Sequence, residues 1–262
     1  GLVMNVSAID GYPTMGTVGG AELAAGQLEA ILDLGVEVLP DTALALSVDG
    51  GVKKVTTHMG AQKAKNVIIA SGARLKSLGV PGEEALFGRG VSQCADCDGG
   101  FFVDQKVVVV GGGDSALQEA LHLADYASEI TIVTRGSSLR ARQSYADRAS
   151  NNPKFSFRWE TTVTEIIGSE SVEAVRLVPM SGGKGQDYEC SGIFIFVGLE
   201  ANNSFLPDDI KRDENGFVKT DMSFVTSMEG VYAVGAARSG YSGQLASAAG
   251  EAASVVAGLP IL

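Results

Sequence analysis

The chain has 262 residues, 45% of them hydrophobic and 34 of them glycine, which is enough for two domains with cores of their own. No apolar run approaches the roughly 20 residues needed to cross a bilayer, and a formal net charge of −11 argues against non-specific binding to nucleic acid. Three cysteines in a chain of this length do not make a secreted disulfide framework, so we expect a reducing compartment, the cytoplasm.

The first predicted elements are a helix over residues 21–35 and a strand-rich stretch over residues 42–73. The second stretch is typical of two strands joined by a turn, then a polar connection and an apolar strand that ends at Gly72. No secretory signal peptide is visible, and the chain starts with Gly1 rather than Met.

The stretch from KVVVV to EITIVTR is typical of a βαβ unit, with a glycine-rich loop and a helix between the two strands. Such a unit implies a parallel sheet. One broad apolar stripe predicts the buried face of the helix: Ala116, Leu117, Ala120, Leu121, Leu123 and Ala124. We expect Gln118, Glu119 and Asp125 on the opposite face to point to solvent.

Residues 161–198 repeat the layout of residues 42–73, with a final apolar strand that ends at Gly198. Such a long-period similarity predicts two copies of one domain type. The second copy opens with the βαβ unit, whereas the first copy has no counterpart of it. We therefore expect a strand and a glycine-rich loop to precede Gly1.

The carboxy-terminal segment, which includes EGVYAVGAAR and a predicted helix, supplies the remainder of the first domain. The sequence thus predicts an α/β protein with two Rossmann-like, three-layer domains, one inserted in the other. We expect residues 1–84 and 200–262 to form the split domain and residues 85–199 to form the inserted one.

The glycine-rich loop GGGDSA fits the G-x-G-x-x-A pattern of a dinucleotide-binding turn. Gly111 permits the tight turn, Gly113 lets a pyrophosphate approach the backbone, and Ala116 allows close helix packing. The strand and helix on either side favour nucleotide binding over a purely structural turn.

The residues after the second strand of the βαβ unit indicate which nicotinamide cofactor is bound. An acid there would bind a ribose hydroxyl, whereas arginine would accommodate a 2′-phosphate. The chain has Thr134, Arg135 and Arg140 at this point, which favours NADPH over NADH. The alternative is that both arginines are ordinary surface charges.

Cys94 and Cys97 form a Cys-x-x-Cys pair just before the nucleotide loop. The pair could be a redox disulfide, two zinc ligands or two buried thiols. Zinc needs two further ligands at short spacing, and only the distant Cys190, His58 and His122 exist, so no metal is expected. We favour redox chemistry, since adjacent sulfurs close a small disulfide.

Asp98 follows the pair directly and could exchange a proton with a leaving thiolate, or else cap a turn. We expect Cys190 to be a core residue and His122 to be structural. A nicotinamide delivers a hydride, whereas a disulfide is opened by thiolate chemistry. We therefore expect a flavin in the duplicated domain to carry electrons from the nicotinamide to the disulfide.

The chain resembles the low-molecular-weight thioredoxin reductase family along essentially its whole length. The segments that carry the resemblance are IDGYP (9–13), IIASGA (68–73), LGVPGEE (78–84), CADCDG (94–99), FFVDQKVVVVGGGDSALQEAL (101–121), GIFIFVG (192–198) and EGVYAVGA (229–236). The resemblance implies an FAD domain split around an NADPH domain, a homodimer, a rotation between the domains, and thioredoxin or a similar small dithiol protein as the partner.

The resemblance also implies roles for individual residues. Cys94 and Cys97 would be the redox disulfide, and Asp98 the acid/base. The NADPH side would comprise Gly111, Gly113, Asp114, Ser115, Arg135 and Arg140. The FAD side would include Ser71, Gly72, Gly235 and Gln244.

The chain departs from the family pattern in three places. The amino-terminal strand and FAD fingerprint do not occur before the pattern resumes at Gly1. Ala236 stands where the family usually has the aspartate that binds the ribityl chain, and Arg135 is followed by Gly136 where the family has paired arginines.

The sequence is compatible with three functions. The first is an NADPH-dependent disulfide reductase with FAD. The second is an FAD-dependent dithiol oxidase with oxygen as the acceptor, which would need little NADPH binding. The third is a non-catalytic nucleotide-binding fragment.

Overall fold

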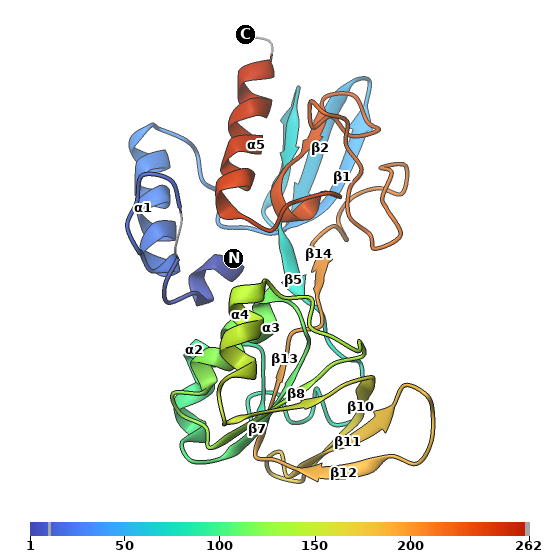
Figure 1. Cartoon of the computed structure of the whole chain (residues 1–262). Coiled ribbons are helices and arrows are strands. Elements are labelled where there is room, and N and C mark those ends of the chain that lie inside the picture. The colour runs from blue at the N-terminus through green and yellow to red at the C-terminus, as the bar shows by residue number, and fades with distance from the viewer. Residues whose placement is uncertain (10–11, 260–262) are drawn as a thin grey trace. The chain divides into compact units, whose positions relative to one another are not determined.

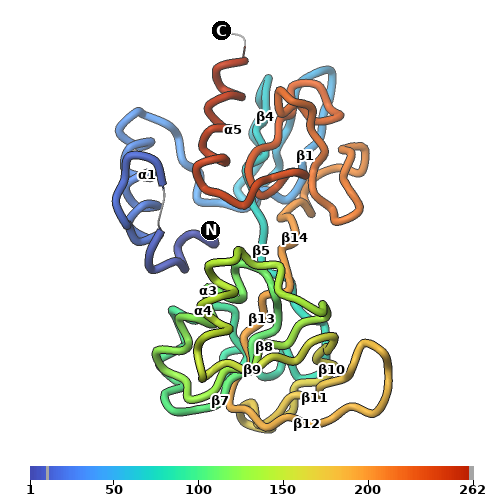
Figure 2. Tube along the Cα trace, in the orientation of Figure 1, coloured from blue at the N-terminus to red at the C-terminus, as the bar shows by residue number. Residues whose placement is uncertain are grey.

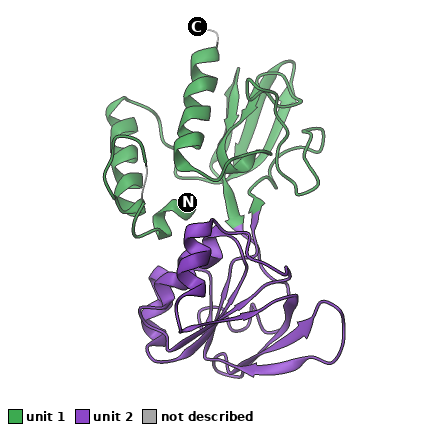
Figure 3. Cartoon of the chain, in the orientation of Figure 1, with its two compact units in different colours: residues 1–74, 200–262 green, residues 75–199 purple. Residues whose placement is uncertain are grey.

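The structure is a computed structural model that describes residues 1–9 and 12–259. The chain divides into two compact units, residues 1–74 with 200–262 and residues 75–199 (Figure 3). The first crossing lies at residues 74/75 rather than 84/85, because Leu78 and Val80 pack against the core of the second unit. In the described part of the chain, no helix is both long and apolar enough to span a membrane.

The second unit is built on a five-stranded parallel sheet with the strand order β6-β13-β7-β8-β9. Its strands are β6 (Val91–Ser92), β7 (Lys106–Val110), β8 (Glu129–Val133), β9 (Phe155–Arg158) and β13 (Gly192–Ile195). The predicted βαβ unit is confirmed, since helix α3 (Asp114–Leu123) connects the parallel strands β7 and β8. The short helix α2 (Ala95–Asp98) lies between β6 and β7 in the chain.

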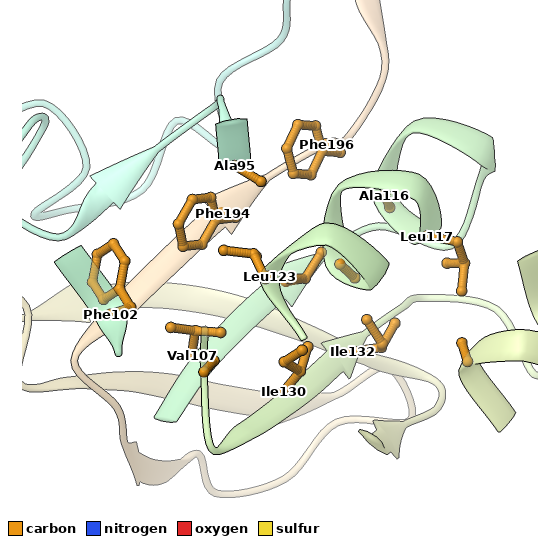
Figure 4. Close-up of a cluster of buried hydrophobic side chains, with 14 residues drawn as sticks. Ala95, Phe102, Val107, Ala116, Leu117, Leu123, Ile130, Ile132, Phe194 and Phe196 are labelled. Carbon is orange, nitrogen blue, oxygen red and sulfur yellow. The ribbon is translucent and has the colours of Figure 1, made fainter. Parts of the chain in front are cut away.

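The parallel sheet is covered on both faces, which explains the unbroken apolar run of β7. Val107 and Val109 face a core shared with α3 and with α4 (Gln143–Ser150), shown in Figure 4. Val108 and Val110 point to the other face, because side chains alternate along a strand. A strand buried on both faces has no polar positions to alternate with.

The other face of the sheet packs on three antiparallel strands (Figure 2). They are β10 (Thr161–Ile167), β11 (Ala174–Pro179) and β12 (Gln186–Glu189). Val163 and Val175 contribute to this second core, so the unit has three layers of helix, parallel sheet and antiparallel sheet. The three-layer prediction is therefore confirmed for this unit.

The internal repeat is also visible in the first unit (Figure 1). It has its own three antiparallel strands, β1 (Ala43–Asp49), β2 (Val52–Thr57) and β3 (Gly60–Ala64). The prediction of a polar connection in each copy is wrong, because that segment forms a strand, β3 in the first copy and β12 in the second. Each lies at a sheet edge, and most of its side chains are exposed, so it lacks the apolar pattern from which strands are predicted.

In the rest of the first unit, two parallel strands place the loops that follow them at the same end of a sheet. Strands β4 (Val67–Ile69) and β15 (Val231–Ala233) run parallel. Helices α1 (Gly20–Asp33) and α5 (Leu245–Gly258) agree with the helices expected at both ends of the chain. At the crossings, β5 (Ala73–Leu75) pairs with β14 (Leu199–Ala201). The described residues also include three 3-10 turns, Leu2–Asn5, Gly99–Phe102 and Gly235–Ala237.

Candidate active site

Cys94 and Cys97 are joined in a disulfide at the start of α2, with their Cα atoms 5.3 Å apart. The Cys97 amide donates a hydrogen bond to the Cys94 sulfur at 3.1 Å. Cys94 is half-buried and Cys97 is exposed, so the disulfide is open to a partner in solution. An amide that donates to sulfur favours a thiolate there once the disulfide is reduced.

Asp98 is connected to the cysteine pair by hydrogen bonds through Ser92, a residue that the sequence did not point to. The Ser92 hydroxyl donates to the Asp98 carboxylate at 2.6 Å, and the same oxygen accepts the Cys94 amide at 3.0 Å. The Asp98 side chain makes no capping bond to the following 3-10 turn, so the capping alternative is not realised. In the sequence, Ser92 stands out only as a polar residue at the end of a strand. The structure shows that this strand is buried.

The expectation that Glu119 faces solvent is wrong, because its carboxylate lies against α2. Its Oε2 accepts the Ala95 amide at 2.8 Å, and burial raises the pKa of this carboxyl. One turn later on α3, His122 contacts Asp96 through a 3.0 Å contact between Nε2 and Oδ1. Gln118 and Asp125 are exposed, as expected.

The glycine-rich loop has the geometry of a nucleotide turn. Gly111 has φ +143°, and a Cβ there would lie 2.4 Å from the Phe196 carbonyl oxygen. Only glycine fits such a position without strain. A Cβ on Gly113 would meet nothing within 4 Å, so the backbone at the start of α3 is open to a ligand. Free N–H groups at a helix start are the usual partners of a pyrophosphate.

A cavity of about 180 Å³ opens at this helix start. Its lining includes four of the predicted cofactor residues, Gly113, Asp114, Ser115 and Arg140. Arg135 is exposed and does not line the cavity. These groups fit a nicotinamide dinucleotide, since they combine open backbone with one cation.

The conformation of the loop around this cavity depends on a residue not expected from sequence. Arg142 binds Asp114 twice, through its amide at 2.7 Å and its Nε at 3.0 Å. The Arg140 amide donates to the Gly112 carbonyl at 2.7 Å. The loop after β8 is thereby attached to the glycine-rich turn.

Three of the four predicted flavin residues lie just after the carboxyl ends of the parallel strands β4 and β15. Ser71 and Gly72 follow β4, and Gly235 follows β15. Parallel pairing of these strands brings the two loops to one edge, where ligands of open α/β sheets bind. Gln244 is exposed at the N-cap of α5. This edge fits part of a flavin nucleotide.

A buried ion pair supports the loop at Gly235. Glu251 accepts the Gly235 amide at 2.7 Å and binds Arg238 through both carboxylate oxygens, at 2.7 and 3.0 Å. Burial of Glu251 opposes ionisation, but these hydrogen bonds outweigh it and hold its pKa below the usual value. Ala236 offers no side-chain acceptor to a ligand.

Cys190 is a free, buried cysteine, as expected. Burial raises the pKa of its thiol to about 12. Of the segment IDGYP, Asp10 and Gly11 lie outside the described residues, while Tyr12 packs against a small apolar cluster formed by Ile9, Val18 and Leu23.

Comparisons with known proteins agree with this geometry. The family model "Pyridine nucleotide-disulphide oxidoreductase" matches residues 11–253. Thioredoxin reductases of Listeria innocua and Treponema pallidum are 38% and 34% identical, over 96% and 91% of this chain and 79% and 78% of theirs. The crystal structure of Lactococcus lactis thioredoxin reductase in its FR conformation matches with TM-score 0.92 and 36% identity, covering 98% of this chain and 85% of that one. The T. acidophilum enzyme matches with TM-score 0.88 and 30% identity over the same shares.

Fold, cysteine pair and relatives lead to one assignment. The chain belongs to the pyridine nucleotide-disulphide oxidoreductases and is similar to the thioredoxin reductases among them, which are flavin-dependent disulfide reductases that use FAD and NADPH.

Proposed function

We propose that this chain reduces thioredoxin or a similar small dithiol protein with electrons from NADPH, through the Cys94–Cys97 disulfide. The observation that carries the proposal is the disulfide itself, which has Cys97 exposed and Asp98 attached to the Cys94 backbone through Ser92. The relatives named thioredoxin reductase support the same partner.

The chemistry at the sulfur atoms follows from thiol–disulfide exchange. When bound, NADPH would supply two electrons and FAD would transfer them to the disulfide. These electrons break the S–S bond of Cys94–Cys97, and the pair takes up protons to become a dithiol. One of these thiols loses its proton, and its thiolate attacks the partner's disulfide to form a mixed disulfide. The second sulfur then displaces the partner and restores the Cys94–Cys97 bond, and the partner leaves as a dithiol with the two protons that the pair has given up. We propose that the Asp98 carboxylate, oriented by the Ser92 hydroxyl, holds and returns the proton of the leaving thiolate.

We propose that residues 75–199 form the NADPH domain. Gly111 and Gly113 would shape the turn for the pyrophosphate, with the amides at the start of α3 as donors. Ser115 and Arg140 would contact the phosphates from the cavity that Asp114 helps to line, and Arg135 would approach the 2′-phosphate from solvent.

We propose that residues 1–74 and 200–262 form the FAD domain. Ser71, Gly72 and Gly235 lie at one edge of the β4–β15 pair, where a nucleotide would bind across the strand ends. Gln244, at the start of α5, would contribute a polar side chain. A flavin bound here would depend on the Glu251–Arg238 pair, because that pair supports the loop of Gly235.

We propose a homodimer in the cytoplasm. Support for the dimer comes from α1 and the segment after it, where large apolar side chains are exposed: Leu28, Ile31, Leu32, Leu34, Val36 and Val38. Several large apolar side chains exposed within one short segment are typical of protein interfaces. Sedimentation of Leu32→Asp tests the dimer, with Met222→Asp as the control because Met222 is exposed elsewhere on the same unit.

The test of the proposed function is an anaerobic titration of the flavin-bound protein with NADPH. Stoichiometric bleaching of the flavin is expected for the reductase, whereas a dithiol oxidase would be indifferent to NADPH. In Cys97→Ser, bleaching should persist while turnover with a disulfide protein is abolished. Unchanged partner turnover in that variant would overturn the role of the pair.

A further inference from the structure

Two side chains of α3 contact the segment between the cysteines, and the proposed function gives them no role. Glu119 and His122 are three residues apart on α3 and therefore lie on one face of the helix. Glu119 binds Ala95, and His122 binds Asp96. Both residues between Cys94 and Cys97 are thus held by the same helix.

Ala95 is fixed from two sides. Its methyl group is fully buried in the core cluster of the second unit, beside Phe194 and Phe196 (Figure 4). Its amide donates to the Glu119 carboxylate at 2.8 Å. Glu119 therefore supplies a partner to an amide that sits directly after Cys94.

Asp96 is held in a similar way. Its Oδ1 lies 3.0 Å from the His122 Nε2, and the two side chains are only 22% and 35% exposed. The His122 ring packs edge-on against Tyr126, with centroids 5.5 Å apart. This packing fixes the ring that donates to Asp96.

The charges of these groups bear on the reduction of the disulfide. A disulfide is neutral, whereas a reduced pair can carry a thiolate, and the Cys97 amide that donates to the Cys94 sulfur would favour one there. Carboxylates near a thiolate disfavour it, and a group that offsets a carboxylate relieves this effect. Partial burial reduces the screening of such interactions by water. Glu119 and His122 should therefore act in opposite directions.

We propose that Glu119 and His122 are positioning residues that set the reduction equilibrium of the Cys94–Cys97 pair, with the Glu119 charge favouring the disulfide and His122, through Asp96, favouring the dithiol. The inference rests on the proposed function only in taking this pair as the redox centre. In the equilibrium concerned, an external dithiol becomes a disulfide, its two electrons break the Cys94–Cys97 bond, and its two protons are shared between the new thiols and solvent.

The experiment measures this equilibrium in the flavin-bound protein with dithiothreitol redox buffers, without NADPH and without a partner protein. Acid quenching and thiol alkylation followed by mass spectrometry give the reduced fraction of the pair. The variants are Glu119→Gln, which keeps a side-chain acceptor for Ala95, and His122→Phe, which keeps a ring against Tyr126. Asp125→Asn is the control, since it removes an exposed acid just after the same helix.

Glu119→Gln should shift the equilibrium toward the dithiol, and His122→Phe toward the disulfide, each by roughly three- to tenfold. His122→Lys should restore most of the parent value, because the lysine ammonium can donate to Asp96 in place of the imidazole. Asp125→Asn should stay within about twofold of the parent. Thermal melting and the flavin spectrum verify that each variant is folded.

A shift of both variants in the same direction would overturn the inference, since that is the result of a merely structural role. Shifts no larger than that of Asp125→Asn would overturn it as well. Failure of the proposed function gives a different result, because NADPH would then leave the disulfide intact while the opposite shifts in dithiothreitol persist.

Discussion

The Ser92 hydroxyl connects two parts of the redox centre, because it donates to the Asp98 carboxylate at 2.6 Å and accepts the Cys94 amide at 3.0 Å. Ser92 is only 4% exposed, so water has little access to take its place. The proposed proton carrier is thereby fixed relative to the first cysteine of the pair.

Ser92→Ala should lower kcat for reduction of the partner by roughly tenfold, because Asp98 loses the donor that orients it. Flavin bleaching by NADPH should keep its rate, since it does not involve this hydroxyl. Ser92→Thr, which keeps the hydroxyl, should recover most of the activity. Steady-state turnover and stopped-flow reduction separate the two steps, and equal losses in both would contradict this role.

Two glycines of the nucleotide turn should respond differently to the same substitution. Gly111→Ala places a methyl against the Phe196 carbonyl and should lower the free energy of unfolding by about 2–4 kcal/mol. Gly113→Ala meets no protein atom within 4 Å and should leave stability nearly unchanged while it weakens NADPH binding. Thermal melting and calorimetric titration with NADPH test the pair. Equal melting temperatures for both variants would be inconsistent with this packing.

Arg140→Ala should raise KM for NADPH by about ten- to a hundredfold, the effect of losing a charge-assisted hydrogen bond to phosphate. Arg135→Ala should have a smaller effect, because Arg135 is exposed and outside the cavity that Arg140 lines. KM for NADH should change little in Arg135→Ala, since NADH lacks the 2′-phosphate. A larger effect at Arg135 than at Arg140 would reverse these assignments.

Phe101 follows the redox pair by only a few residues and is 77% exposed. We expect it to contact the partner protein, since an exposed aromatic side chain is a typical interface anchor. Phe101→Asp should raise KM for the partner by roughly tenfold and leave NADPH-dependent flavin reduction unchanged. Met222→Asp, at 98% exposure on the other unit, serves as the control. Equal KM values for the two variants would remove Phe101 from the interface.

The Glu251–Arg238 pair should make stability depend on pH. Because the folded-state pKa of Glu251 is depressed, its stabilising contribution is present above the usual carboxyl range and is lost as the pH falls through the folded-state value. Glu251→Gln should therefore cost about 3 kcal/mol at neutral pH and progressively less in acid. Glu200→Gln is the control, since its pair with Arg74 is exposed and should contribute below about 1 kcal/mol. Melting temperature against pH gives the comparison.

The parts of the fold that sequence predicted are those with strong local patterns. The βαβ unit follows from a continuous apolar strand, a glycine-rich turn and an apolar helical stripe, which occur within about thirty residues. The repeat follows from the same reasoning applied twice. The edge strands β3 and β12 were missed. Each pairs with a single neighbouring strand and has mostly exposed side chains, so its sequence carries little of the apolar pattern that indicates a strand.

For the candidate site, the sequence predicts Cys94, Cys97 and Asp98 but not the side chains that contact them. Cys94, Cys97 and Asp98 are adjacent in sequence, so their association is local. Glu119 comes from an element outside the local Cys-x-x-Cys motif, and its bond to Ala95 exists only once α2 and α3 pack together. A helical pattern assigns such an acid to the solvent face, because the pattern does not include the neighbouring helix.

The burial of Cys190 has a practical consequence for counting thiols. A sulfhydryl with a pKa of about 12 carries almost no thiolate near neutrality and resists alkylating reagents while the fold is intact. The native oxidised protein should therefore incorporate no label, the native reduced protein two, and only the unfolded reduced chain all three. Label stoichiometry thus reports the oxidation state of the active pair without any cysteine having to be replaced.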